Sequence, residues 1–414
     1  MTGSITWHPF TIRFVTPAFL GQDPGHVDGH SSAFPFPVAS LRGALRYWLR
    51  ALVGAHVGNN LEALRRVEEK VYGAAAGGDS GTPSRVLLRC RQPVRRANTT
   101  DNSWLGSPVS EDDISQIGYL LGPGIWNSKR PRAEHRAVAP DTRVQFAVRT
   151  AGETSAALFL ASLWALRTFG GLGARVRRGF GTFQLVDVPQ LGIDTPWLGR
   201  DNPEDLTAVL AMVREHVTRL TGVVEPDGAR PSYPRFDTTG KSHKTRSVLL
   251  RRGRNSDTGP PATDAGSALA ACGRLWQAHR AELSREDSIY SQIVKPFLDG
   301  GDPSSDEFTL GTYGLPVVYY DRVTRRSATV EPVVDGKSAR RASPVWLRVR
   351  PGRAAWQLHT LVFLAEWLPT EARLRIKDRR RSRPVASPSA DTVDEELGYW
   401  LDAVTAPISD APSG

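Results

Sequence analysis

Cysteine and methionine are almost absent from the 414-residue chain, which has two of each. Two cysteines as far apart as Cys90 and Cys272 exclude a disulfide framework and a four-cysteine zinc site. We therefore expect two buried free thiols. No apolar run approaches the roughly 20 residues that cross a bilayer, and the opening residues lack the charged and apolar regions of a signal peptide. These absences lead us to expect a cytoplasmic protein that does not associate with membranes.

Lysine is also scarce, since the chain has seven lysines and 46 arginines. Against 43 acidic residues they give a net charge of +10. Guanidinium groups bind phosphate bidentately and release condensed counterions when they do so, which favours a phosphate-rich partner. Genomic base composition also inflates arginine, so the charge alone does not identify that partner. A hydrophobic content of 40% excludes a wholly disordered chain, and the length indicates two or three domains.

The first 190 residues predict the order strand, helix, strand, strand, helix, strand. That order is the ferredoxin-like, or RRM-like, βαββαβ pattern, an antiparallel sheet with its helices on one face. The other face is left free, and such faces commonly bind RNA. The strands are expected at 5–14, 85–94, 142–150 and 182–188, and the helices at 40–53, 60–72 and 154–169.

Arginine alternates with apolar residues in two of these strands. In the strand at 142–150, Arg143 and Arg149 point away from Val144, Phe146 and Val148. In the strand at 85–94 the same alternation turns Arg89 and Arg91 away from the apolar face formed by Val86, Leu88 and Cys90.

Residues 191–404 predict a second α+β domain, a degenerate copy of the first, after a proline-containing linker at 189–203. Its helical windows lie at 203–220 and 265–283, and its strand-like runs at 247–251, 315–320 and 344–350. Residues 97–140 are polar and rich in glycine and proline, so we interpret them as an insertion or extended loop. Residues 405–414 are small and polar and predict a disordered tail.

A glycine-rich segment at 170–181 joins the last helix of the first domain to its last strand. It has five glycines in twelve residues together with Arg175, Arg177 and Arg178. Glycine lets backbone approach a ligand closely, and the arginines make phosphate the natural guest. A dinucleotide fold is excluded because its glycines stand between a strand and a following helix. A tight helix-to-strand turn with solvated arginines is the alternative.

The helix at 40–53 is amphipathic, with Ser40 as the expected N-cap. Its apolar side includes Trp48, which we expect in the core. Arg42, Arg46 and Arg50 form a basic stripe opposite, and Tyr47 flanks that stripe, where it could stack on a base.

GGLGARVRRGFG after a helix, and SLRGALRYWLRAL after the first strand, resemble the RAMP superfamily of CRISPR-associated proteins. The segments FLG at 19–21, LP at 315–316 and RRASP at 340–344 are similar to the two-domain RAMP subunit at the head of the type III-B, or Cmr, effector. The resemblance implies two ferredoxin-like domains and assembly with other RAMP subunits on a CRISPR RNA near its 3′ end. It implies no catalytic role, cofactor or metal.

Spacing and resemblance together give the residues expected to contact CRISPR RNA or its target RNA. They are Arg42, Gly43, Arg46, Tyr47, Arg50, Gly171, Gly173, Arg175, Arg177, Arg178, Gly179, Phe180, Lys337, Arg340 and Arg341. Two further basic runs leave alternatives open. The run at 241–254 is either an arm that contacts RNA or a solvated loop. The run at 373–383 contacts either phosphate or a partner subunit.

Two other functions compete with RNA binding alone. Asp23, His26, Asp28 and His30 share a loop and would serve a RAMP endoribonuclease or a metal, although their spacing lacks the helical framework of a zinc motif. An assembly adaptor whose arginines meet acidic protein is the third hypothesis. We favour a non-catalytic RNA-binding subunit. The bases of the RNA are then read by pairing between guide and target rather than by this protein.

Overall fold

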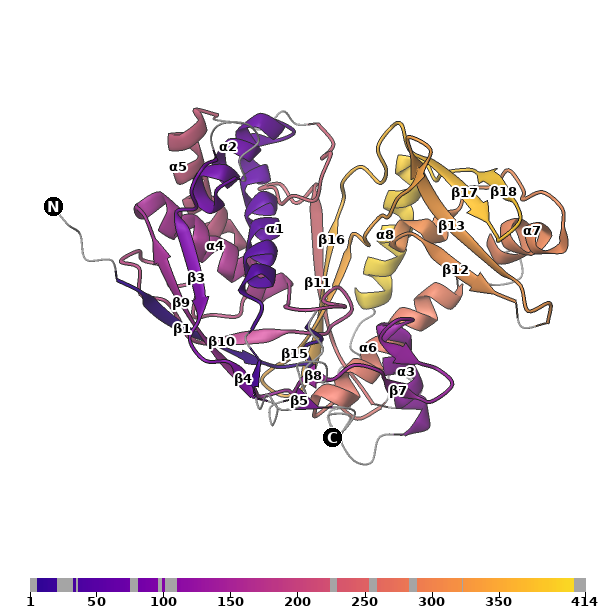
Figure 1. Ribbon diagram of the computed structural model, residues 1–414, viewed down its shortest axis with the longest axis horizontal. Coiled ribbons are helices and arrows are strands. Elements are labelled where there is room, and N and C mark those ends of the chain that lie inside the picture. Colours follow the sequence, from indigo (N-terminus) through magenta and orange to yellow (C-terminus); the bar gives the residue numbers. More distant parts are fainter. Residues whose placement is uncertain are drawn as a thin grey trace, which may run out of the picture.

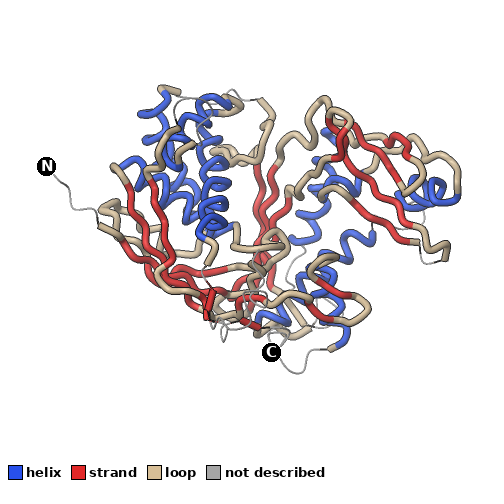
Figure 2. The backbone as a smooth tube through the Cα atoms, viewed as in Figure 1, coloured by secondary structure: helices blue, strands red, loops and turns tan. Residues whose placement is uncertain are grey.

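The computed structural model describes residues 6–20, 33–34, 36–74, 81–95, 99–100, 110–223, 229–252, 259–282, 289–321 and 323–405. It is an α+β structure of helices and antiparallel sheets, as expected (Figures 1 and 2). None of the helices in these ranges combines the length and the apolarity that a membrane crossing requires.

A four-stranded antiparallel sheet organises the first half in the order β10-β1-β9-β3. Its strands are β1 (His8–Phe14), β3 (Val86–Cys90), β9 (Arg143–Thr150) and β10 (Phe183–Asp187). One face is covered by α1 (Val38–Val57), α2 (Leu61–Tyr72), α4 (Glu153–Phe169) and α5 (Leu206–Thr221) (Figure 1). The predicted succession of elements is confirmed, with α2 as a second helix before β3.

The alternation of apolar and polar residues explains the strands of this sheet. Burial on all sides explains the composition of α4. Phe10, Ile12 and Phe14 of β1 are all buried beneath the helices, as a strand with one covered face requires. Every residue of α4 from Ser155 onward is buried, which is why its sequence is rich in Ala and Leu on all sides. Helix α1 begins at Val38, directly after Pro37, so the expected capping role of Ser40 is wrong.

The second half contains two sheets. Strands β11 (His243–Leu249), β16 (Trp356–Phe363) and β15 (Val345–Pro351) form the inner one in that order. The outer sheet consists of β12 (Val317–Tyr320), β13 (Ser327–Val334), β17 (Arg373–Lys377) and β18 (Ser382–Val385), with β14 (Lys337–Ser338) beside β13. The helices are α6 (Ala265–Glu282), α7 (Lys295–Asp299) and α8 (Ala390–Thr405).

The helical windows predicted at 203–220 and 265–283 are confirmed as α5 and α6, although α5 packs with the helices of the first half. The strand-like runs correspond to β11, β12 and β15. The sequence did not predict β13, β16 or α8. The basic run at 241–254 includes β11, and the run at 373–383 forms most of the hairpin of β17 and β18. In that hairpin Arg375 and Lys377 both pair with the buried carboxylate of Glu331, at 2.7 and 2.6 Å.

Minor elements complete the chain. They are β2 (Ala33–Phe34), β4 (Val94–Arg95), β5 (Thr99–Thr100), β6 (Trp126–Asn127), β7 (Arg132–Ala133), β8 (Ala137–Val138), the 3-10 turns Pro203–Asp205 and Thr309–Tyr313, and the π-helical turn Tyr290–Val294.

The insertion at 97–140 is not an extended loop, because it contains helix α3 (Glu111–Leu121). The Ser110 side chain caps this helix by accepting a hydrogen bond from the Asp113 amide. The helix packs against α6 of the second half, where the Arg274 guanidinium lies 2.5 Å from the Asp113 carboxylate. A Cβ at Gly273 would lie 2.5 Å from the Gln116 carbonyl oxygen, so the two helix backbones approach closely. The insertion therefore belongs to the core of the second half.

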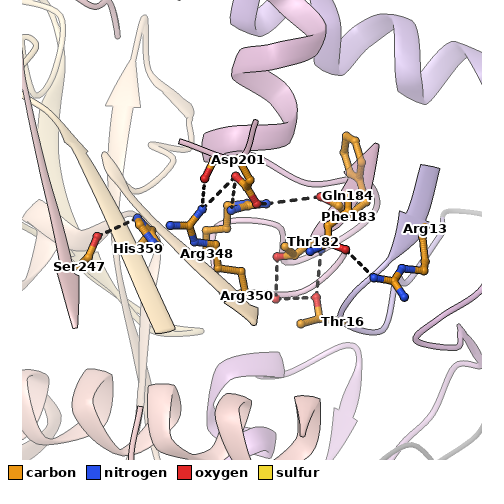
Figure 3. A network of polar contacts seen from close by, with 11 residues as sticks. Arg13, Thr16, Thr182, Phe183, Gln184, Asp201, Ser247, Arg348, Arg350 and His359 are labelled. Atoms are coloured by element: carbon orange, nitrogen blue, oxygen red, sulfur yellow. Dashed lines mark hydrogen bonds and ion pairs between the residues drawn. The ribbon is translucent and has the colours of Figure 1, made fainter. Parts of the chain in front are cut away.

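A buried ion-pair network joins the two halves near Asp201 (Figure 3). Arg348 of β15 is 2% exposed and donates to both carboxylate oxygens of Asp201, at 3.2 and 3.0 Å. Arg350 lies 3.1 Å from the same carboxylate. Burial acts to raise the pKa of Asp201, but the charges of Arg348, Arg167 and Arg350 outweigh it and hold that pKa below its ordinary value. One carboxylate thus compensates guanidinium groups from both halves.

Replacing Asp201 with Asn should lower the free energy of unfolding by about 3 kcal/mol, because buried guanidinium groups lose their counterion. The stabilisation by the carboxylate is complete above the ordinary aspartate pKa of 3.8 and is lost as the pH falls through the lower folded value. The variant should therefore lose less of its remaining stability on acidification. Denaturant unfolding at neutral and acidic pH measures both effects, with exposed Asp194→Asn as the control; equal stability of the two variants would contradict the role of the network.

Candidate nucleic-acid interface

A cleft of about 600 Å³ lies where five distant segments meet, one of which is the stretch after β1. Helix α1 contributes Tyr47, the glycine-rich segment contributes Arg177, the insertion contributes His135 and β15 contributes Trp346. The remaining lining residues are Phe19, Leu20, Ser40, Ala44, Trp48, Gly124, Ile125, Gly171, Leu172, Gly173, Ala174 and Val176. Four residues that the sequence analysis selected therefore line one cleft, namely Tyr47, Gly171, Gly173 and Arg177.

Arg177 is held in this cleft by aromatic rings. Its guanidinium carbon lies 4.3 Å from the centre of the Trp346 ring and 5.6 Å from that of Tyr47, within range of a cation–π interaction. The backbone is fixed because the Leu347 amide of β15 donates to the Arg177 carbonyl. Among the described residues no carboxylate pairs with Arg177. The half-buried Arg177 guanidinium therefore gives the cleft a positive charge that rests on aromatic rings and has no carboxylate partner among the described residues.

Two other predicted arginines stand at the edges of the same site. The Arg341 guanidinium donates to the carbonyl oxygens of Trp367 and Glu366, at 2.5 and 3.2 Å. Burial lowers the pKa of Arg341, and the charge of nearby Arg177 acts in the same direction. Arg175 is exposed and donates to the Pro123 carbonyl, which ties the glycine-rich segment to the insertion. Both arginines have structural partners of their own.

The glycines of the 170–181 segment are required by contacts within the protein. A Cβ at Gly181 would lie 2.0 Å from the Leu172 carbonyl oxygen, and one at Gly173 would lie 2.6 Å from the Phe19 carbonyl oxygen. Both glycines also have positive φ angles, 67° and 108°. Close packing of backbone on backbone thus accounts for the glycine count, and the case for a phosphate ligand rests on the arginines.

Three predicted contacts are corrected or weakened by their surroundings. Phe180 is fully buried and packs edge-on against Phe19, so its side chain is not available to RNA. Gly179 is buried as well, with a position for Cβ 2.9 Å from a Val349 methyl group. The guanidinium of Arg178 lies over the Trp276 ring, and burial followed by the charge of Arg280 lowers its pKa to about 10.

The basic stripe of α1 lies outside the residues that line the cleft. Arg46 and Arg50 pair with the buried carboxylate of Glu68 on α2, at 2.6 and 3.3 Å. Arg42 and Gly43 are exposed on the same helix. Trp48 is in the core as predicted, at 1% exposure. The stripe therefore serves in part to dock α1 on α2.

The other predicted site residues do not lie in the cleft. Lys337 and Arg340 are exposed beside the outer sheet and do not line the cleft. Asp23, His26, Asp28 and His30 lie outside the described residues. Within the described ranges, no group of three or more His, Cys, Asp or Glu side chains is placed to hold a metal.

Sequence reasoning missed Trp346 and His135 as lining residues. Trp346 follows the RRASP segment by two positions, so the resemblance of that segment to the family could have pointed to Trp346 as a site residue. His135 had no such signal, because its approach to the cleft depends on how the insertion folds.

The space around each glycine predicts opposite effects for two alanine substitutions, one in the glycine-rich segment and one on α1. Gly181→Ala should lower the free energy of unfolding by about 2 to 4 kcal/mol, because it combines backbone strain with overpacking. Gly43→Ala should raise it by about 0.5 to 1 kcal/mol, since that helical glycine has open space around it. Chemical denaturation of both variants tests this, and a stable Gly181→Ala protein would show that the segment is not packed as described.

Comparisons with known proteins place this geometry in a family. Residues 11–184 match the model of the RAMP superfamily. The CRISPR system Cmr subunit Cmr1-2 of Pyrococcus furiosus is 29% identical over 192 residues, which cover 42% of this chain and 93% of that protein. Subunit Cmr1-1 of the same organism is 28% identical over 202 residues, 47% of this chain and 54% of that protein.

The crystal structure of apo Cmr1 from Pyrococcus furiosus shares the fold, with a TM-score of 0.50, 18% identity and 96% of each chain covered. The family resemblance expected from the sequence is thus confirmed. Residues 11–184 thus resemble the RAMP superfamily, and the fold of the chain resembles that of Cmr1.

Proposed function

We propose that this protein is a non-catalytic subunit of a type III-B CRISPR effector complex and binds single-stranded guide or target RNA in the cleft. The names of its relatives as Cmr subunits of the CRISPR system support the assignment to a complex. Other RAMP subunits would then be its protein partners. Arginine contacts to phosphate fix position, while pairing between guide and target reads the sequence.

The observation that carries the RNA proposal is the position of Arg177 over Tyr47 and Trp346. A cleft of about 600 Å³ has the volume of a small-ligand site, large enough for a nucleotide. The Arg177 guanidinium offers hydrogen bonds to a phosphate, and the half-buried Tyr47 ring offers a surface for a base. The first turns of α1, which line the cleft with Ser40 and Ala44, add the positive end of a helix dipole.

We also propose that the chain is built from two ferredoxin-like domains, approximately 1–190 and 191–404. The order β10-β1-β9-β3 supports this for the first, because it is the fourth, first, third and second strand of a βαββαβ chain. In the second half, β11, α6, β15, β16 and α8 follow the same succession, and the strand order β11-β16-β15 is first, third, second. A fourth strand is lacking among the described residues, which agrees with a degenerate copy.

Arg177→Ala should weaken the binding of a short single-stranded RNA about tenfold, because a charged hydrogen bond contributes roughly 1.5 to 3 kcal/mol. The slope of log affinity against log salt should fall by about 0.7 for the lost phosphate contact. Fluorescence anisotropy across a salt series measures both quantities. The control is Arg66→Ala, which removes an exposed arginine of α2 that pairs with Glu62. Equal affinity of Arg177→Ala and the parent would rule out the cleft as the RNA site.

Membership of a guide complex has a separate test. When the chain is purified from a host that expresses its neighbouring genes, short RNAs with one common repeat-derived end should accompany it. Sequencing of the extracted nucleic acid checks this. Recovery of the protein alone, free of nucleic acid, would favour the adaptor hypothesis.

A further inference from the structure

The first sheet has a second face, opposite the helices. Helices α1, α2, α4 and α5 all lie on one side of the strands β10-β1-β9-β3 (Figure 1). Among the described residues no helix packs on the other side. The cleft is built from other elements, since its lining includes no residue of β1, β3, β9 or β10. This open face is therefore a surface distinct from the cleft.

Strand register brings several arginines together on the open face. Arg143 lies opposite Arg13, and Arg149 lies opposite Leu87, so each pair projects from the same side of the sheet. Arg89 of β3 lies opposite Ala147 of β9, which in turn lies opposite Pro9 of β1. Ala147 is two residues from Arg149 along β9, so Arg89 projects from the same side of the sheet as Arg149. Arg89 and Arg143 are exposed. Three strands thus present guanidinium groups in one direction.

A tryptophan lies among these arginines. The half-buried Trp7 immediately precedes β1, and the Arg89 guanidinium carbon lies 4.3 Å from the centre of its ring. The corresponding distance from Arg149 is 5.7 Å. The surface therefore combines an aromatic ring with two cations beside it.

The positive charge of the open face is mostly uncompensated. Within the described part of the chain, no carboxylate pairs with Arg89, Arg143 or Arg149. Arg13 is the exception, because it lies 3.5 Å from the Asp141 carboxylate and donates to the Gln184 side chain. This contrasts with Arg46 and Arg50 on the helical side, which have a buried carboxylate as partner.

We propose that the open face, defined by Trp7, Arg13, Arg89, Arg143 and Arg149, is a second binding surface for single-stranded RNA. A base would stack on Trp7 while the guanidinium groups contact flanking phosphates, which is how sequence-tolerant single-strand sites combine stacking with charge. An acidic protein segment would satisfy the charge and would leave the tryptophan without a role, so RNA fits the whole surface better. This inference rests on the RNA-binding function proposed above and adds a second surface to the cleft.

Charge reversal of the full-length protein tests this. The Arg89→Glu, Arg149→Glu double variant should bind a labelled 30-nucleotide unstructured RNA at least about tenfold more weakly than the parent. Its salt slope should fall by about 1.4, because two phosphate contacts are lost. Trp7→Ala should weaken binding by about 5- to 160-fold, the range for one stacked base. The matched control is Arg65→Glu, Arg66→Glu on the exposed side of α2, which changes the charge equally and should bind within twofold of the parent.

Photo-crosslinking provides a readout that does not depend on the folding of a variant. RNA containing 4-thiouridine, bound to the parent protein, should crosslink to the peptides that contain Trp7 or Arg89. Absence of both crosslinks would overturn the proposal.

The anisotropy outcomes separate the two surfaces. If Arg177→Ala binds weakly and the double variant binds like the parent, the open face is not an RNA site and the cleft remains. The converse result supports the open face and removes the cleft. A parent that binds no RNA overturns both. If the double variant loses affinity for polyglutamate and keeps its affinity for RNA, the face recognises acidic protein and the RNA proposal is wrong.

Discussion

The contact of Trp346 with Trp48, with ring centres 4.9 Å apart, holds the two halves of the molecule together. Trp346 enters the core of the first half although it belongs to β15 of the second, and Tyr47 packs against it at 5.3 Å. Leu347, the next residue, binds the glycine-rich segment, because its amide donates a hydrogen bond to the Arg177 carbonyl. These contacts hold the elements that line the cleft in fixed positions relative to one another. Without Trp346, Arg177 would lose the nearer of its two aromatic rings.

The arginines of this chain fall into groups that net charge does not distinguish. Arg348 is buried and neutralised by Asp201, and Arg375 is neutralised by Glu331. The charge of these residues is compensated within the fold. Arg177 and Arg89 instead rest on aromatic rings without a carboxylate among the described residues, which keeps their charge available. The placement of a few buried carboxylates therefore decides where a highly basic chain keeps positive charge available to a ligand.

Much of the first half could be predicted from sequence because its signals are local. Alternation in β9 and helical spacing in α1 each need only a dozen residues to be recognised, and both were confirmed. The second half was less predictable: β16 is a largely buried strand, and its pattern does not show which elements cover it. Helix α3 had local signals in Ser110 and the three acidic residues that follow, but its apolar side is explained only by α6, about 150 residues later.

The candidate site was harder to predict because its defining contacts connect distant segments. Sequence could not distinguish glycines that approach a phosphate from glycines that approach the carbonyl of Phe19. Nor could it show that Arg46 would pair with Glu68 on the following helix. It did identify Tyr47 and Arg177, because an aromatic residue beside a basic stripe and an arginine in a glycine-rich turn are unusual locally. Their common partner, Trp346, became evident only in the folded chain.

The packing of α3 on α6 has a mechanical consequence. The chain leaves the first half for α3, returns to form β9, and crosses again before β11. Three covalent crossings restrict the rotation of one half against the other far more than a single linker would, since hinge motion needs a few residues free to absorb the change in angle. These crossings therefore restrain the width of the cleft between the halves. Any ligand of the cleft would have to adapt its own conformation to that restrained width.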